Sequence, residues 1–158
     1  MLPRTIKIVI AIGSNVEQET HLDEAKEKLQ ATFDKVVFSS AVWTEPIGLS
    51  GSDRFLNALA VGYTQVAPHR VEIALKDIER QCGRTRTAPS NVVALDLDLL
   101  LYDGEICHPD DWGRDYIQSL AQQIGVEVPT EEERKNAVGY TVRKSNKGRK
   151  KKKSQSCA

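Results

Sequence analysis

The sequence predicts an α+β fold of the ferredoxin-like type, in which an antiparallel sheet carries helices on one face. The first observation behind this prediction is order, because segments with strand and helical periods follow one another as strand, helix, strand, strand, helix, strand. The second is size, because 158 residues with 40% apolar side chains suffice for one domain with its own core. The sheet face without helices would be left to loops and ligands.

The first three elements lie in the N-terminal third of the chain. A short β-branched run at 6–12 predicts a buried first strand, and Gly13-Ser14-Asn15 predicts the turn that ends it. Apolar residues at helical spacing predict a first helix over about 21–33. The alternation of apolar and polar side chains over 35–43 predicts the second strand.

The next three elements lead toward the middle of the chain. Residues 56–64 predict a third strand after a polar, Gly-containing loop over 44–54. Pro68 suits the first turn of a second helix, and Gly83 follows the end of its apolar stripe. Residues 95–102 then predict the fourth strand.

The C-terminal part combines a short helix with a segment of divided charge. Apolar spacing predicts a last helix over about 111–124. The formal net charge of zero conceals a basic run, because residues 143–153 hold eight basic side chains and no acid follows Glu133. We therefore expect one folded domain over 1–128 and an acidic-to-basic, disordered tail over 129–158.

Composition argues against several classes of protein. No stretch approaches the roughly 18 apolar residues of a membrane span, and the N-terminus lacks a signal-peptide pattern. Cys82, Cys107 and Cys157 have no metal-ligand spacing and are interpreted as reduced thiols. We expect a monomeric, cytoplasmic protein with no membrane partner.

The predicted strand at 95–102 opens with two carboxylates in an otherwise apolar segment. Because side chains alternate along a strand, Asp96 and Asp98 point to one side, roughly 6–7 Å apart, while Leu97 packs on the other. Two neighbouring acids repel each other unless they face water or hold a cation such as Mg²⁺. The pair is therefore a candidate metal site, with a solvated strand end as the simpler alternative.

Cationic motifs flank the acidic pair on both sides. Gly83-Arg84-Thr85-Arg86 precedes it, and His108-Pro109 is followed by Arg114 and then Tyr116. Guanidinium groups bind phosphate oxygens bidentately, and a histidine can donate to the same oxygens. Cations around a metal-binding acidic pair therefore indicate phosphate chemistry.

Two further motifs complete an ordered set, Ile12-Gly13-Ser14-Asn15 near the start and Phe55-Leu56-Asn57 in the middle. Over about residues 8 to 116, the order and spacing of the motifs resemble the 6-hydroxymethyl-7,8-dihydropterin pyrophosphokinase family of the folate pathway. The resemblance implies transfer of pyrophosphate from ATP to the dihydropterin, which gives the pterin diphosphate and AMP. It also implies Mg²⁺ as the cofactor.

The resemblance implies a role for each candidate residue. Asp96 and Asp98 would hold Mg²⁺ that bridges the triphosphate, and Arg84 and Arg86 would be further catalytic groups at the phosphates. The residues implied to contact ATP are Lys76, Glu79, His108 and Arg114. The residues implied to contact the pterin are Thr44, Ile47, Phe55, Asn57 and Tyr116.

The chain departs from the family pattern in the loop before the acidic strand. Members carry a tryptophan and an arginine there, whereas this chain has Val93 near the expected arginine, and Trp112 is a candidate substitute for the tryptophan. Two alternatives therefore stay open. One is a diverged member that binds nucleotide or pterin without this catalysis, and the other is an RNA-binding module that uses the basic tail.

Overall fold

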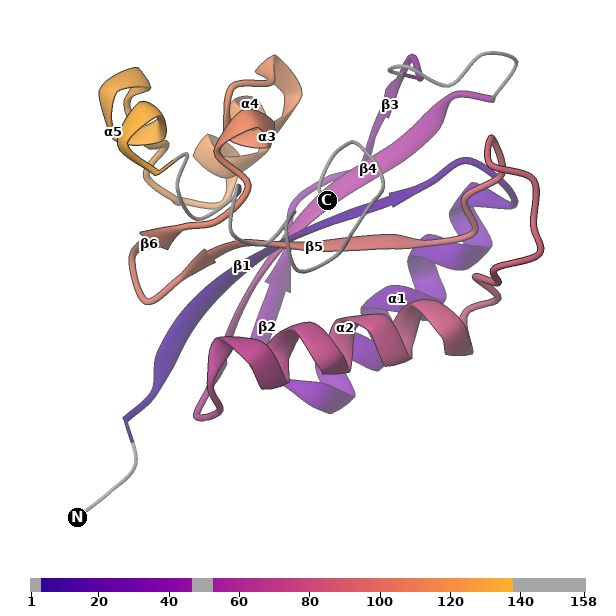
Figure 1. Cartoon of the computed structure of the whole chain (residues 1–158), viewed down its shortest axis with the longest axis horizontal. Coiled ribbons are helices and arrows are strands. Elements are labelled where there is room, and N and C mark those ends of the chain that lie inside the picture. The colour runs from indigo at the N-terminus through magenta and orange to yellow at the C-terminus, as the bar shows by residue number, and fades with distance from the viewer. Residues whose placement is uncertain (1–3, 47–52, 138–158) are drawn as a thin grey trace.

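The computed structural model describes residues 4–46 and 53–137, which form an antiparallel sheet with helices against it (Figure 1). The described elements, in chain order, are β1 (Ile6–Ser14), α1 (Gln18–Thr32), β2 (Asp34–Phe38), β3 (Val42–Thr44), β4 (Phe55–Thr64), α2 (Pro68–Gln81), β5 (Asp96–Tyr102), β6 (Glu105–Ile106), α3 (Pro109–Trp112), α4 (Asp115–Gln123) and α5 (Glu131–Asn136). None of the described helices is both long and apolar enough to cross a lipid bilayer.

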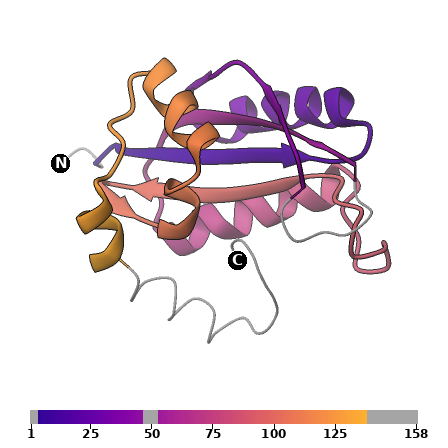
Figure 2. The ribbon, with the colours of Figure 1, turned by 90° about the horizontal axis from the view of Figure 1, so that it is seen from above.

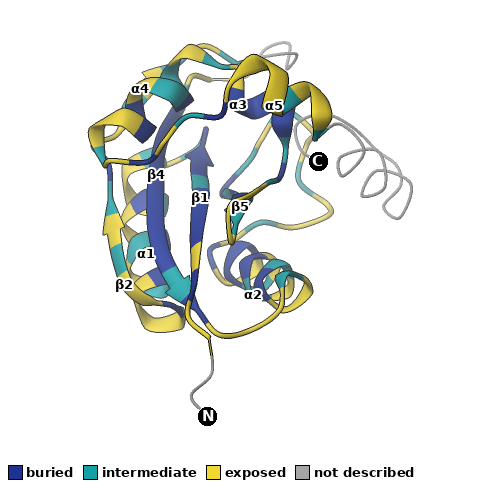
Figure 3. Cartoon of the chain, turned by 90° about the vertical axis from the view of Figure 1, so that its left-hand side faces the viewer, coloured by how far each residue is buried: buried dark blue, intermediate teal, exposed yellow. Residues whose placement is uncertain are grey.

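The sheet has the strand order β2-β4-β1-β5-β6, and β3 pairs with β4 beyond the end of β2. Every described pairing is antiparallel. The central strand β1 lies between β4 and β5 and is buried almost along its whole length, as its apolar composition requires (Figure 3). The predicted ferredoxin-like α+β class is confirmed.

Helices lie against both faces of this sheet. On one face, Ile8, Ile10 and Ile12 of β1 pack with residues of α1 and α2 in the larger core cluster. On the other face, Val9 of β1 packs with Trp112 and residues of α4 in a second cluster. Seen from above, the α3–α4 segment lies over one side of the strands and α1 and α2 beyond them (Figure 2). The second face is therefore partly covered by helix rather than left to loops and ligands alone.

The predicted second strand over 35–43 is two strands, β2 and β3, with a break between them. At the break, the Ser39 hydroxyl accepts a hydrogen bond from the Leu59 amide at 2.8 Å. The amide of Ser40 donates to the Gln123 side chain rather than to a neighbouring strand. Alternation alone predicted one strand, because it contains no sign that side chains would take over ladder hydrogen bonds.

The predicted last helix over 111–124 is likewise two helices. The chain turns at Gly113 and Arg114, and Arg114 has an extended backbone with φ −80° and ψ 137° that cannot continue a helix. A further helix, α5, follows and has the capping box of Thr130 and Glu133. Ordered structure thus extends past the expected boundary at 128, whereas the part of the predicted tail at 138–158 lies outside the described residues.

Candidate active site

One row of residues runs across the sheet where β1 ends. In the register of the strands, Gly13 lies opposite Asn57 of β4 and opposite Asp96 of β5. Residues directly opposite each other in an antiparallel sheet point to the same face. The next residues on this face of β1, β4 and β5 are Ala11, Leu59 and Asp98, and Leu59 belongs to the cluster under α4. Asn57, Asp96 and Asp98 therefore share the α3–α4 face of the sheet.

Gly13 allows the side chains of Asn57 and Phe55 to lie close to β1. It lies inside β1, which extends to Ser14, and not in the turn that the sequence predicted. A Cβ atom at Gly13 would lie 3.0 Å from Oδ1 of Asn57 and 3.6 Å from the Phe55 ring. A side chain at this position would therefore crowd Asn57 and lie in contact with Phe55, which gives this glycine a steric role that turn chemistry does not explain.

The two acids alternate with buried leucines, as predicted. Asp96 and Asp98 are half-buried, whereas Leu97 is 4% exposed and packs toward α1 and α2. Asp96 already has a partner, because the Arg84 Nη1 atom donates to its Oδ1 at 3.0 Å and to the Leu95 carbonyl oxygen at 3.2 Å. Arg84 is therefore placed at the acidic pair itself.

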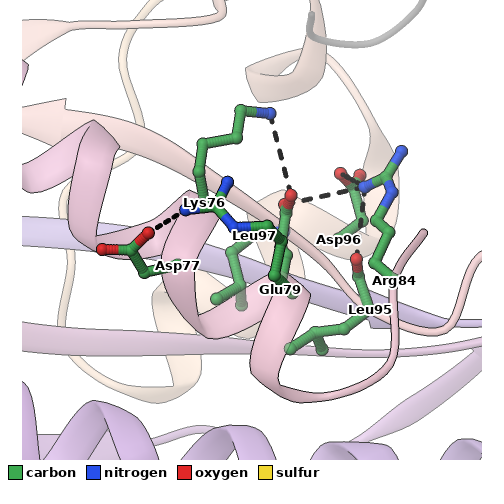
Figure 4. Close-up of polar contacts among 8 residues, drawn as sticks. Lys76, Asp77, Glu79, Arg84, Leu95, Asp96 and Leu97 are labelled. Atoms are coloured by element: carbon green, nitrogen blue, oxygen red, sulfur yellow. Dashed lines mark hydrogen bonds and ion pairs between the residues drawn. The ribbon is translucent and has the colours of Figure 1, made fainter. Parts of the chain in front are cut away.

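Glu79 connects α2 to the same place (Figure 4). Its Oε2 accepts a hydrogen bond from the Leu97 amide at 2.8 Å and lies 3.6 Å from Arg84 Nη1. Its Oε1 lies 3.7 Å from Lys76 Nζ. Because β6 pairs only with the last residues of β5, the Leu97 amide is at a sheet edge, and Glu79 supplies the acceptor that a strand would otherwise provide.

Burial has a cost for Glu79. The side chain is 5% exposed, and desolvation by burial, followed by the negative charge of Asp96, raises its pKa from 4.5 to about 7. Lys76, Arg84 and the Leu97 amide lower the pKa in the opposite direction and only partly offset the burial. Glu79 thus binds a proton more tightly in the folded protein than in the unfolded chain.

This shift predicts a pH dependence of stability. Because folded Glu79 binds its proton more tightly, protonation stabilises the folded state, and this contribution is complete below about pH 4.5. The contribution is lost as the pH rises through about 7. We expect Glu79→Gln to remove on the order of 2 kcal/mol of the pH-dependent change in unfolding free energy between these limits. Urea unfolding of the natural protein and of Glu79→Gln from pH 4 to 8, without added metal, measures this difference. Parallel curves of unfolding free energy against pH would contradict the raised pKa of Glu79.

The segment after β6 contributes three more polar side chains. Arg114 Nε donates to Asp111 Oδ1 at 3.1 Å, and His108 Nδ1 lies 3.9 Å from Asp111 Oδ2. Burial lowers the pKa of His108 to about 4, so the ring is neutral near pH 7 and can donate a hydrogen bond without carrying charge. The cation predicted at this position is therefore supplied by Arg114 alone.

The electrostatic neighbours of Asp96 show that these segments converge. After desolvation, the charge of Asp96 contributes to the raised pKa values of Glu79, Asp111 and Tyr116. The same charge opposes the burial that lowers the pKa of His108. Since these residues come from α2, α3, α4 and the loop before α3, the acidic strand is the centre of the arrangement.

The predicted pterin residues lie on the same side of the sheet. Thr44 faces Phe55 across the β3–β4 pair, and the side-chain Nδ2 of Asn57 donates to the Thr44 hydroxyl at 2.7 Å. Phe55 and Asn57 alternate with Leu56, so they share a face as expected. Tyr116 is half-buried against the cluster under α4, and Ile47 lies outside the described residues. The stacking of Phe55 and Tyr116 on either side of a pterin stays a prediction.

Three further residues were singled out in the sequence, and of these the roles of Arg86 at the phosphates and of Lys76 at ATP stay predictions. Arg86 is exposed and forms no hydrogen bond or ion pair with a described residue, so it is not joined to Asp96 as Arg84 is. Lys76 is 68% exposed and reaches only the outer oxygen of Glu79 among the described residues. Trp112 is not available as a substitute for the loop tryptophan, because it is 0% exposed and its Nε1 donates to the Leu100 carbonyl oxygen at 2.8 Å.

Asn15 has a function that the sequence did not indicate. Its side chain is buried, its Nδ2 donates to the Asn91 carbonyl oxygen at 2.8 Å, and its Oδ1 accepts from the Val93 amide at 2.6 Å. Its own backbone amide donates to the Val93 carbonyl oxygen at 3.0 Å. Asn15 thus attaches the loop before the acidic strand to the end of β1, and no local spacing relates residues so far apart in the chain.

We expect Asn15→Ala to release this loop, because the half-buried Asn91 and Val93 backbone groups lose their side-chain partner. The expected loss of unfolding free energy is about 2 kcal/mol. Trypsin cleavage after the exposed Arg86 should accelerate about tenfold, since this bond is cut from the opened loop. Asn15→Asp keeps the acceptor for the Val93 amide, so its stability and its cleavage rate should lie between those of the natural protein and those of Asn15→Ala. An unchanged cleavage rate in Asn15→Ala would contradict the attachment.

Comparison with known proteins gives a consistent result. A family model described as 7,8-dihydro-6-hydroxymethylpterin-pyrophosphokinase matches residues 9–126. A 2-amino-4-hydroxy-6-hydroxymethyldihydropteridine pyrophosphokinase of Porphyromonas gingivalis is 28% identical over 141 residues, covering 78% of this chain and 96% of the relative. The enzyme of the same name from Bacillus subtilis is 29% identical over 153 residues, covering 86% and 90%. A folate synthesis bifunctional protein of Arabidopsis thaliana is 33% identical over 138 residues, which are 77% of this chain and 28% of that protein.

Proposed function

The chain belongs to the 7,8-dihydro-6-hydroxymethylpterin-pyrophosphokinase family, and we propose that the α3–α4 face around Asp96 and Asp98 carries out the family reaction with bound magnesium. That reaction transfers pyrophosphate from ATP to 6-hydroxymethyl-7,8-dihydropterin in folate biosynthesis. The protein is thus an ATP-dependent diphosphotransferase. We expect the enzyme to work as a monomer in the cytoplasm.

The reaction joins the hydroxymethyl oxygen of the pterin to the β-phosphorus of ATP. The bond from this phosphorus to the oxygen that bridges the α and β phosphates breaks, and AMP leaves with that oxygen. The pterin hydroxyl releases its proton, and the pterin carries the β and γ phosphates as a diphosphate. Positioning of the two substrates and neutralisation of phosphate charge supply most of the rate in such transfers.

The acidic pair fits magnesium. Mg²⁺ bound with a nucleotide takes one or two protein carboxylates and completes its octahedron with phosphate oxygens and water. The described residues contain no group of three or more metal-ligating side chains, so a site built from Asp96 and Asp98 needs the ligand's phosphates to be complete. Bound there, Mg²⁺ would neutralise charge on the transferred and leaving groups.

Arg84 would change partners when ATP and metal bind. In the free protein its Nη1 atom lies 3.0 Å from Asp96 Oδ1, and Asp96 would be a metal ligand in the proposed site. Glu79 Oε2 is 3.6 Å from the same nitrogen and offers a second partner. A guanidinium released from Asp96 can turn to the phosphates, where Arg114 approaches from the α4 side.

One observation supports the proposal more than any other, and it is the row of Asn57, Gly13 and Asp96 across β4, β1 and β5. It places the residues proposed for the pterin on the same sheet face as the acidic pair. Two substrates bound at neighbouring points of one rigid sheet can meet in a fixed orientation.

The test is the formation of AMP from ATP in the presence of Mg²⁺ and the dihydropterin. AMP and the pterin diphosphate should appear in equal amounts, and neither should form if the dihydropterin or the metal is left out. Binding of an ATP analogue without any AMP would favour the diverged, non-catalytic alternative. Family membership does not favour the RNA-binding alternative, and deletion of residues 143–158 should leave AMP formation unchanged.

A further inference from the structure

Asp111 is a buried carboxylate that the proposed chemistry does not use directly. It lies in α3 and is 7% exposed. Its backbone amide donates to the His108 carbonyl oxygen at 3.0 Å, and its carbonyl oxygen accepts from the Arg114 amide at 3.1 Å. The backbone therefore holds Asp111 between the two residues proposed to contact ATP from this segment.

The carboxylate of Asp111 is hydrogen-bonded to Arg114 and lies near His108. Oδ1 accepts the hydrogen bond of Arg114 Nε at 3.1 Å, and Oδ2 lies 3.9 Å from His108 Nδ1. The exposed fractions of the side chains are 10% for Asp111 and His108 and 27% for Arg114. A charge-assisted hydrogen bond so shielded from water is stronger than one at the surface and restricts the guanidinium accordingly.

The atom used on Arg114 matters. The contact with Asp111 goes through Nε, and the two Nη groups form no hydrogen bond with a described residue. Phosphate oxygens are bound by pairs of guanidinium N–H groups in one plane. A hydrogen bond at Nε fixes that plane and leaves the outer N–H groups for a ligand.

Asp111 is itself attached to the core of the protein. Its neighbour Trp112 is fully buried and donates through Nε1 to Leu100 of β5, two residues after Asp98. The Gln118 side chain of α4 donates to the Trp112 carbonyl oxygen at 2.9 Å. The orientation of Asp111 is therefore tied to the strand that holds the acidic pair.

We propose that Asp111 is a positioning residue of the nucleotide subsite, which fixes the Arg114 guanidinium in the orientation in which it meets the phosphates of ATP. The identity of the ligand rests on the proposed function. Asp111 acts through Arg114 and makes no contact of its own with the substrate.

Asp111→Asn is the main variant, because it removes the charge and keeps the shape of the side chain. Asp110→Asn is the matched control, since Asp110 is an exposed neighbour in α3 and the change in net charge is identical. Arg114→Ala and the double variant Arg114→Ala with Asp111→Asn complete a cycle. Asp111→Glu keeps the charge and serves as the conservative rescue.

In steady-state assays of the full chain, Asp111→Asn should raise the KM for ATP about tenfold, which corresponds to about 1.4 kcal/mol. The KM for the dihydropterin should stay within twofold, and Asp111→Glu should recover most of the ATP effect. In the Arg114→Ala background, Asp111→Asn should add less than twofold, because the group through which it acts is gone. A full tenfold effect in that background, or equal effects of Asp111→Asn and Asp110→Asn, would overturn the inference.

A second measurement needs no substrate. The ¹H–¹⁵N signal of the Arg114 Nε–H group should exchange with water at least tenfold faster in Asp111→Asn than in the natural protein or Asp110→Asn. Unchanged exchange in Asp111→Asn overturns the inference, whatever the activity. A different outcome is that the natural protein forms no AMP and binds no ATP analogue, while exchange accelerates in Asp111→Asn alone. The proposed function then fails and with it the assignment of Arg114 to ATP, whereas the fixing of Arg114 by Asp111 stands.

Discussion

Replacement of Asp96 by asparagine is expected to lower kcat/KM for AMP formation by about 10³-fold, the scale seen when one charge-stabilising group is removed from a site. Asparagine offers a neutral oxygen, which binds Mg²⁺ more weakly than the charged oxygen of a carboxylate does. It also removes the ion partner of Arg84, whose Nη1 lies 3.0 Å from Asp96 in the free protein. Asp98→Asn should have an effect of the same order, because the pair would share the metal.

The measurement is the initial rate of AMP release as Mg²⁺ is varied, with ATP and the dihydropterin fixed. The variants should need more Mg²⁺ for half-maximal rate as well as losing rate. Asp103→Asn is the control, because Asp103 lies at the far end of β5 with φ 54°, a backbone conformation that asparagine tolerates. Normal activity in folded Asp96→Asn would refute the metal assignment.

Truncation of Trp112 is expected to have the largest effect on stability, with a loss of about 3–5 kcal/mol of unfolding free energy for Trp112→Ala. Trp112 is 0% exposed and fills the space between α3, α4 and the sheet within the second core cluster. For a chain of this size, such a loss lowers Tm by about 10 °C. Trp112→Phe should cost less, because the Leu100 carbonyl oxygen also accepts from the Cys107 amide and keeps one partner.

Trp43→Ala is the matched control for this prediction. Trp43 is 44% exposed, and its ring lies 5.0 Å from the Arg54 guanidinium, so its truncation should cost less than about 1 kcal/mol. Thermal and urea unfolding of the three variants measure the difference. Equal losses for Trp112→Ala and Trp43→Ala would show that α3 is not held by its tryptophan. In that case the rigidity assigned to Asp111 and Arg114 would also lose its basis.

The parts of the fold that could be predicted are those with a local signal. The period of two over 95–102 placed Asp96 and Asp98 on one face, and the α+β class followed from the order of elements along the chain. The break inside 35–43 could not be predicted in the same way. It depends on hydrogen bonds from the Leu59 amide to the Ser39 hydroxyl and from the Ser40 amide to the Gln123 side chain, which form only between segments distant in the chain.

The same distinction applies to the site. Arg84, Glu79 and Arg114 were identified from motif order. The structure places Arg84 and Glu79 at the acidic strand and pairs Arg114 with Asp111, whose pKa the charge of Asp96 helps to raise. Asn15 follows β1 in a bend, as predicted, but its buried side-chain contacts with the loop before β5 were not predicted. Trp112 was a candidate substitute for the missing tryptophan, and its complete burial rules this out. Burial depends on which surfaces meet, and a residue type does not specify that.

The sequence by itself determined the α+β class, the acidic pair on the fourth predicted strand and the family to which the chain belongs. Each of these depends on periodicity or on motif order along one chain. Only the tertiary structure decided that α3 and α4 cover the second face, that Asn15 holds the loop before β5, and that Asp111 fixes Arg114. The physical reason is that hydrogen bonds and burial between distant segments are set when the sheet and helices pack, and neither leaves a period in the sequence.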